Sequence, residues 1–413
     1  MRRAGLYACL LLCGTADATA QGVAGLDSVR SMSTPNSEPR GIRAGPVVTY
    51  LSVGLRGQYN DNIHAADSNP KADYVAHIRP RLEVRTRRRR HGARATLEAD
   101  AARHLRNPAA DAVAYGGRVT AHLDLDRTTR VGVTLAAQRE YEDPAAPDAP
   151  GGETRTPIRR YAARLEADTR LGRLGAAAAG GVERLNFGDV APDNQASEGE
   201  NDDRDRSSAR VAARLSYGLS AVYEPFIQGA YNVVDYDRHR DASGFDRDSR
   251  GFTLGAGLRY RPNGFTVAET RVGYRKQSTA AARLGPVEGL TAEIALRSNL
   301  TPHTTLDVSA QRLLRQTTAD NASGFFATRG RARIDQRLWH NLFLGANAAF
   351  ARHTFVSALG EREDRLFSAR VDARYDPSAF LRLTADYRYT RRVSNRDAGF
   401  ARNQVTLGAE LRY

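Results

Sequence analysis

Hydrophobic and polar side chains alternate one by one along most of the chain. Near the C-terminus, Leu381, Leu383 and Ala385 alternate with Arg382 and Thr384. A period of two places successive side chains on opposite faces of a β-strand. No segment of comparable length keeps a helical period, so the pattern predicts an all-β protein. The clearest alternation covers 76–85, 118–125, 163–168, 210–217, 292–297, 370–375 and 381–389.

The connections between these segments are of two kinds, which follow each other strictly in turn. Short ones are expected near 88–91, 126–129, 170–173, 218–222, 261–264, 299–303, 339–341 and 376–379. Long polar ones are expected near 60–72, 104–113, 141–159, 188–207, 236–250, 277–288, 314–325, 353–363 and 391–401. Short turns at one rim and long loops at the other are typical of transmembrane barrels.

The pattern therefore predicts a single transmembrane antiparallel up-and-down β-barrel over 46–413, with about eighteen strands. Sixteen is the alternative count, because alternation is weakest around 174–187 and 304–313. The chain contains no run of 18 apolar residues. A barrel does not need such a run, because only every second residue faces lipid. Aromatic residues gather at both ends of the predicted strands, as expected of two interfacial girdles.

The N-terminus predicts export from the cytoplasm. Arg2 and Arg3 precede a short apolar stretch, and Ala18-Thr19-Ala20 supplies a cleavage pattern. We interpret residues 1–20 as a signal peptide, since the apolar stretch is too short to span a bilayer. The alternative, a lipoprotein signal ending at Cys13, is disfavoured because Leu12 stands where a small residue is needed.

Residues 21–45 are rich in Gly, Ser and Pro and have no period. They predict a disordered periplasmic lead-in to the barrel. The chain's two cysteines, Cys9 and Cys13, both lie in the predicted signal peptide. The mature chain is therefore expected to contain no disulfide and no cysteine-based zinc site.

The chain carries a formal net charge of +14 at pH 7. The charge is spread along the sequence of an exported protein, which argues against a nucleic-acid partner. Two interpretations of the charged strand face stay open: a hydrated wall of cross-strand ion pairs, or an anion-selective pore lined by arginine. The lumen-lining candidates are Arg56, Arg79, Arg81, Arg118, Arg164, Arg214, Arg297, Arg333, Arg370, Arg374 and Arg388.

Catalytic and metal-binding patterns are missing from the sequence. The nine histidines are scattered and fall mostly at predicted turns or loops. No nucleophile elbow, zinc-binding helix motif or calcium-binding loop pattern occurs. The acidic segment 198–205 lacks the spacing of a calcium loop. We therefore predict neither an enzyme nor a metal or other cofactor.

The final strand carries a pattern of its own. Thr406, Gly408, Leu411 and Tyr413 occupy the positions polar, glycine, apolar and aromatic, ending at the terminal carboxylate. This pattern resembles the C-terminal β-signal of outer-membrane proteins, which the barrel assembly machinery recognises. Recognition would proceed by adding an unpaired strand to another sheet edge. The resemblance implies that the assembly machinery is a partner.

A second resemblance lies in residues 54–85, which read GLRGQYNDNIHAADSNPKADYVAHIRPRLEVR. The Tyr-Asn-Asp-Asn-Ile opening, the polar loop, Asp73-Tyr74 and the Arg-Pro-Arg-Leu strand resemble a family of β-barrel porins found in exopolysaccharide gene clusters. The rest of the chain matches that family in length and general pattern only.

The family resemblance implies an outer-membrane barrel in contact with lipid and lipopolysaccharide, and with polysaccharide export components as partners. Two functions are expected from it. The first is a porin-like channel for surface polysaccharide export or solute passage. The alternative is a non-conducting structural or assembly component of a polysaccharide secretion machine.

Overall fold

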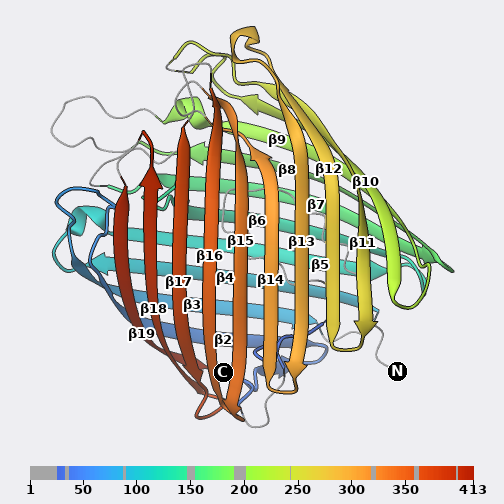
Figure 1. Cartoon of the computed structure of the whole chain (residues 1–413). Helices are drawn as coiled ribbons and strands as arrows, with labels where there is room; N and C mark the ends of the chain where they lie inside the picture. The colour runs from blue at the N-terminus through green and yellow to red at the C-terminus, as the bar shows by residue number, and fades with distance from the viewer. Residues whose placement is uncertain are drawn as a thin grey trace.

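The computed structural model describes residues 26–32, 37–86, 90–146, 154–189, 201–241, 243–317, 322–357, 362–396 and 399–413. Within them the chain forms a closed wall of long strands around a central lumen (Figure 1). The predicted signal peptide over 1–20 lies outside the described residues. The described part contains no helix that is long and apolar enough to span a membrane.

A three-residue strand, β1 (Ile42–Ala44), precedes eighteen long strands. These long strands are β2 (Val47–Asn60), β3 (Asp73–Thr86), β4 (His91–His104), β5 (Ala112–Asp124), β6 (Arg130–Tyr141), β7 (Pro157–Leu171), β8 (Leu174–Phe187), β9 (Arg206–Tyr217), β10 (Tyr223–Tyr236), β11 (Ser249–Asn263), β12 (Thr266–Thr279), β13 (Val287–Thr301), β14 (Thr304–Arg315), β15 (Ala322–Trp339), β16 (Leu342–Ser357), β17 (Glu363–Tyr375), β18 (Leu381–Ser394) and β19 (Phe400–Arg412). Short 3-10 turns occur at η1 (Pro108–Ala110), η2 (Asp202–Arg204) and η3 (Ala282–Leu284).

Each long strand pairs antiparallel with the strand that follows it, and β19 pairs with β2 to close the barrel. The closing register places Leu407 opposite Gly57 and Arg412 opposite Ser52. This confirms the predicted all-β, up-and-down barrel. The two weakly patterned segments form β8 and β14, so the count is eighteen rather than sixteen.

Connection lengths follow the prediction over most of the barrel, with short turns at one rim and longer loops at the other. The connections expected as long over 353–363 and 391–401 are shorter, at 358–362 and 395–399, because the flanking strands extend into them. The turn between β5 and β6 shows how a side chain fixes such a turn. The Asp126 carboxylate accepts hydrogen bonds from the backbone N–H groups of Thr128 and Thr129, at 2.6 and 2.8 Å. These donors lower the pKa of Asp126 to about 2, because they stabilise the charged carboxylate.

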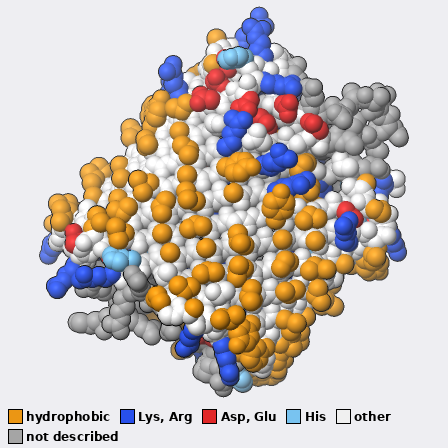
Figure 2. All heavy atoms as spheres, turned by 180° about the vertical axis from the view of Figure 1, so that it is seen from behind, with side chains coloured by type: hydrophobic (Ala, Val, Ile, Leu, Met, Phe, Trp, Pro, Cys, Tyr) orange, Lys and Arg blue, Asp and Glu red, His pale blue; other side chains and the backbone are white. Residues whose placement is uncertain are grey.

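The two faces of the wall differ as the alternation predicts. Large apolar side chains point outward and stay exposed, including Leu97 and Leu165, each with 58 % of its surface accessible. Figure 2 shows these hydrophobic side chains spread across the outer surface, with charged groups gathered toward its margins. A soluble protein would bury such residues, whereas a barrel turns them toward lipid. Most of the charged members of each strand therefore face the lumen.

Aromatic pairs stand at both ends of the strands. Tyr223 and Tyr260 stack near the short-turn rim with ring centroids 5.3 Å apart. Tyr59 and Tyr74 lie near the long-loop rim with centroids 5.2 Å apart. Their amphipathic rings are suited to the two interfaces of a bilayer.

Candidate functional site: the lumen of the barrel

All eleven predicted lumen arginines lie on the inner face, on strands distributed around the barrel. Most are engaged in ion pairs with carboxylates of the same strand or of another strand of the wall. Arg214 Nη1 lies 2.8 Å from Glu269 Oε1, and Arg297 Nε lies 2.6 Å from Asp307 Oδ1. The others in carboxylate pairs are Arg79, Arg81, Arg164, Arg333, Arg370 and Arg374.

This pairing favours the interpretation of a hydrated wall for most of the predicted set. Water-exposed pairs of this kind each contribute little, typically 0–1 kcal/mol. Their main effect is to cancel charge along the wall.

Arg56 and Arg118 are exceptions, because neither forms an ion pair among the residues that the structure describes. Both side chains are exposed to the lumen. Both line a pocket of about 460 Å³ on the inner wall formed mainly by β2 to β6. The pocket's carboxylates, in contrast, each have a partner: Asp100 pairs with Arg79, Glu98 with Arg81, Glu140 with Arg160 and Glu410 with Arg382. The pocket therefore presents two guanidiniums that no direct ion pair holds among the described residues, although Asp100, Asp386 and Glu410 also act on Arg56 at longer range.

A denser cluster lies at the short-turn end of the lumen. Asp376 is 2 % exposed and receives Arg382 Nε at 2.7 Å and Arg374 Nε at 3.3 Å. The Arg374 guanidinium also lies over the ring of Phe343, 4.0 Å from its centroid. These contacts hold the charged groups beside the turn between β17 and β18.

The lead-in peptide lies beside this cluster, close enough for Arg30 to act electrostatically on Arg374. Residues 26–32 lie inside the lumen against β13, β14, β15 and β17. Arg297 Nη1 donates to the carbonyl of Leu26 at 3.0 Å, and the Val29 N–H donates to Thr305 Oγ1 at 2.9 Å. Val29 is completely buried there. We expected a disordered periplasmic segment over 21–45, and the described part differs because wall donors and acceptors satisfy its backbone.

Arg30 anchors this peptide in a cradle of two carboxylates. Its guanidinium binds Asp335, at 3.2 Å, and Asp372. Asp335 and Asp372 lie on β15 and β17, on either side of Gly345 on β16. A Cβ at Gly345 would stand 2.9 Å from Asp372 Oδ1 and 3.0 Å from Arg30 Nη1. The glycine therefore leaves the space in which the guanidinium sits.

The long-loop mouth is crossed by the loop between β6 and β7. Glu142 receives both terminal nitrogens of Arg204, at 2.6 and 3.0 Å. Farther along the loop, Ala145 packs in a buried cluster with Ala65 and Phe400. Phe400 opens β19, and the barrel order separates β19 from β6 by β2 to β5. The loop therefore extends inward over the mouth.

A second crossing involves the loop after β10. Arg247 is 4 % exposed and its Nη1 donates to the carbonyl of Thr317 at 3.1 Å. Its Nε binds Asp241 at 2.6 Å within its own loop. This arginine ties the loop after β10 to the loop after β14, so the mouth is narrowed from two sides.

The last strand places the predicted assembly residues on both faces. Thr406 and Gly408 point into the lumen, whereas Leu411 is 65 % exposed on the outer face. Tyr413 is also outward, and its ring stacks near Phe380 with centroids 6.1 Å apart. These positions are those of an ordinary closing strand, and recognition by assembly machinery stays a prediction.

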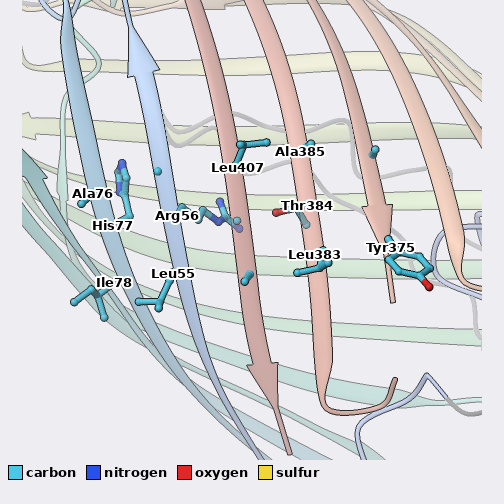
Figure 3. Close-up of a pocket in the computed structure, with 14 residues that line it drawn as sticks. Leu55, Arg56, Ala76, His77, Ile78, Tyr375, Leu383, Thr384, Ala385 and Leu407 are labelled. Atoms are coloured by element: carbon cyan, nitrogen blue, oxygen red, sulfur yellow. The ribbon is translucent and has the colours of Figure 1, made fainter. Parts of the chain in front are cut away.

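A groove follows the closing seam on the outer side. It has a volume of about 760 Å³ and is bordered by Leu55, Ile78 and Leu383 (Figure 3). Small residues such as Gly57 and Ala409 lie between these larger side chains. Lipid chains would fill such a groove in a bilayer. Among the described residues, no group of three or more His, Cys, Asp or Glu is placed to hold a metal ion.

Comparisons with known proteins agree with this architecture. A family model described as "Putative beta-barrel porin 2" matches residues 34–413. No match was found among curated proteins.

Several solved structures are similar in shape at low sequence identity. OpdK, an outer membrane protein of Pseudomonas aeruginosa, is 12 % identical over 88 % of this chain and 99 % of its own, with a TM-score of 0.48. OpdO of the same organism is 13 % identical over 88 % and 96 %, with a TM-score of 0.46. OccAB4 of Acinetobacter baumannii is 11 % identical over 92 % and 99 %, with a TM-score of 0.46.

Proposed function

Because the chain belongs to the family described as putative beta-barrel porin 2, we propose that it is an outer-membrane channel for polar, preferentially anionic solutes. The observation that carries the proposal is the inner wall of a closed eighteen-strand barrel, where Arg56 and Arg118 stand without ion pairs beside a pocket. An apolar outer face and a charged inner face are what a water-filled membrane channel requires.

The positive charge available to a permeating ion is confined to a small part of the inner wall. Ion pairs neutralise most of the wall, so a permeating ion meets few unbalanced groups. Arg56 and Arg118 are two of these, and they line the same pocket. A low-dielectric surround focuses their field into the lumen, which raises the local concentration of anions.

Surface polysaccharide is the solute class that the family resemblance suggests. Many such polymers carry carboxylate groups, and these would be attracted by the exposed guanidiniums. We propose participation in their export on this basis, with short turns facing the periplasm and long loops facing outward.

Planar bilayer recordings test the channel. Under a KCl gradient at low salt, the reversal potential should report preference for chloride. The preference should shrink at 1 M KCl, because the Debye length falls from about 10 Å at 0.1 M to about 3 Å. Arg56→Gln combined with Arg118→Gln should reduce chloride preference.

Arg184→Gln is the matched control. It removes the same charge on the outer face, where Arg184 binds Asp237 and Ser207, and it should leave selectivity unchanged. Cation preference of the wild type would contradict the anionic assignment. Silence of the folded protein would contradict the channel itself.

A second candidate function is a non-conducting component of a polysaccharide secretion machine. The presence of residues 26–32 in the lumen and of the loop at Ala145 over the mouth favours it. The same recordings separate the two candidates. A folded barrel that stays silent, together with loss of surface polysaccharide when the protein is removed from cells, would support the structural role.

A further inference from the structure

We propose that residues 26–32 form a latch inside the lumen, held by Arg30 between Asp335 and Asp372, and that release of this latch widens the passage. The part concerning passage rests on the proposed channel function. The part concerning binding does not, because it follows from contacts within the chain alone.

The latch is bound along its backbone by the ends of two neighbouring wall strands, β13 and β14. The carbonyls of Leu26 and Asp27 accept hydrogen bonds from Arg297 and Asn299, each at 3.0 Å. The next contact is the Val29 N–H, which donates to Thr305 Oγ1. Thr305 in turn donates to Asn299 Oδ1 at 2.7 Å, so the receiving groups are held by one another. The wall thus offers two side-chain donors, Arg297 and Asn299, and one acceptor, Thr305, in fixed positions. These positions match the backbone groups of residues 26–29 in one alignment of the peptide.

The charge of the surrounding wall residues favours a cation at position 30. Asp335 and Asp372 have side chains only 5 % exposed, and Arg333 already binds both, at 2.6 and 3.0 Å. One guanidinium between two carboxylates leaves a net negative charge in a poorly hydrated place. Arg30 supplies the second cation and brings the cluster to neutrality. Removing one partner of such a buried cluster is strongly unfavourable.

The latch is nevertheless suited to release. The latch contributes only the short segment 26–32 to the contact. The Arg30 side chain also keeps 25 % of its surface exposed. Its tether to the barrel is the three-residue pairing of β1 with β2. A tethered segment binds at a high effective concentration, so these few contacts are enough to keep it bound without making it permanent.

Thiol accessibility tests the bound state without any need for conduction. In a Val29→Cys variant the thiol should be protected from a water-soluble maleimide, whereas Ser31→Cys, at an exposed position of the same segment, should react quickly. Adding Arg30→Gln should speed labelling of Val29→Cys by roughly tenfold or more, since loss of an ion-pair partner costs well over the 1.4 kcal/mol of a tenfold change. Arg40→Gln, from the same lead-in, should not.

The labelling result decides the latch by itself. Equal and rapid labelling of Val29→Cys with and without Arg30 would overturn it, because the segment would then not be held in the cradle.

Conductance tests the consequence of release. The Arg30→Gln barrel should show a larger single-channel conductance than the wild type, and Arg40→Gln should match the wild type. In a Val29→Cys/Thr305→Cys variant, oxidation should hold conductance at or below the wild-type level, and reductant should reverse this. Protection that Arg30→Gln relieves without any change in conductance would overturn the claim that the latch narrows the passage. If no variant conducts, the proposed channel function fails, while labelling still decides the latch.

Discussion

Arg402 Nη1 lies 3.3 Å from Asp143 Oδ1, although four strands separate β19 from β6 in the barrel wall. Arg402 is on β19, whereas Asp143 is in the loop that leaves β6. The pair holds this loop inward over the mouth. It does so beside the buried contact of Ala145 with Phe400, so a charge contact and an apolar contact fix the same loop.

Loss of the pair should free the loop. In an Ala145→Cys background the thiol should be protected, since Ala145 is 7 % exposed. Arg402→Gln should increase its labelling several-fold, because the loop loses its charged anchor. Arg391→Gln removes the same charge from the outward face of β18 and serves as the control. Labelling that is equally slow in both variants would show that the apolar contact alone holds the loop.

The same contact should depend on pH. Burial raises the pKa of Asp143, but the Arg402 guanidinium and the Ala145 N–H outweigh burial and lower it below 3.8. A lowered folded-state pKa gives stability that is present above 3.8 and is lost as pH falls through the lowered value. A pyridyl disulfide reagent, which reacts in acid, should find Ala145→Cys protected at pH 5 and increasingly exposed as the pH falls below 3.8 and through the lowered pKa. Exposure already at pH 5 would contradict the assigned anchor.

The face assignment can be tested at two adjacent residues. Leu383 is 39 % exposed on the outer face, and Thr384 lines the lumen pocket. Leu383→Arg should destabilise the folded barrel, by less than the roughly 2–4 kcal/mol of an arginine at the bilayer midplane, because Leu383 lies near the short-turn end of β18. Thr384→Arg should cost much less because its charge meets water. Heat-modifiable gel mobility measures the folded fraction, and equal losses would refute the assignment.

Assembly should depend on the terminal aromatic ring. Deleting Tyr413 removes the backbone hydrogen bonds that Tyr413 exchanges with Leu51, as well as the ring beside Phe380. We expect membrane insertion in cells to fall sharply, with accumulation in the periplasm. Tyr413→Phe keeps the ring and should insert normally. Normal insertion of the truncated chain would reduce the motif to a simple strand end.

Membrane orientation can be read from the two rims. A cysteine at Asp203, in the loop before β9, should react with an impermeant thiol reagent on intact cells. A cysteine at Ser378, in the turn before β18, should react only after the outer membrane is opened. The opposite result would invert the proposed topology, and reaction at both sites would argue against a membrane-spanning barrel.

Strand positions were predictable from the sequence because each strand carries its own alternation. The turn expected over 376–379 lies between β17 and β18, which end and begin at Tyr375 and Leu381. The residues of each strand also predict, without its neighbours, which face is apolar and meets the membrane and which face is charged. Even the weakly patterned strand β8 forms, because pairing on both sides supplies what its many alanines and glycines do not.

The contents of the lumen were not predictable in this way. Arg30 stands in an aperiodic stretch, and its partners Asp335 and Asp372 are some 300 positions away along the chain. Asp143 and Arg402 are separated almost as widely. Nothing near any of these residues in the sequence points to its partner. Many of the ion pairs that neutralise the predicted arginines are also cross-strand contacts, such as Arg297 with Asp307 and Arg370 with Asp386, which require the register and not only the period.

Strand β1 has a consequence for how the barrel closes. It pairs with β2 at residues 47–49, on the same edge of β2 that β19 occupies from Ser52 onward. The β1 hairpin involves neighbours in sequence, so it can form early, whereas β2 and β19 come from opposite ends of the chain and must meet after a long search. The hairpin therefore pairs residues 47–49 of β2, whose backbone groups on this edge would otherwise have no strand partner until β19 arrives. It also marks the point on β2 at which the arriving strand has to stop, so the seam can close in one register.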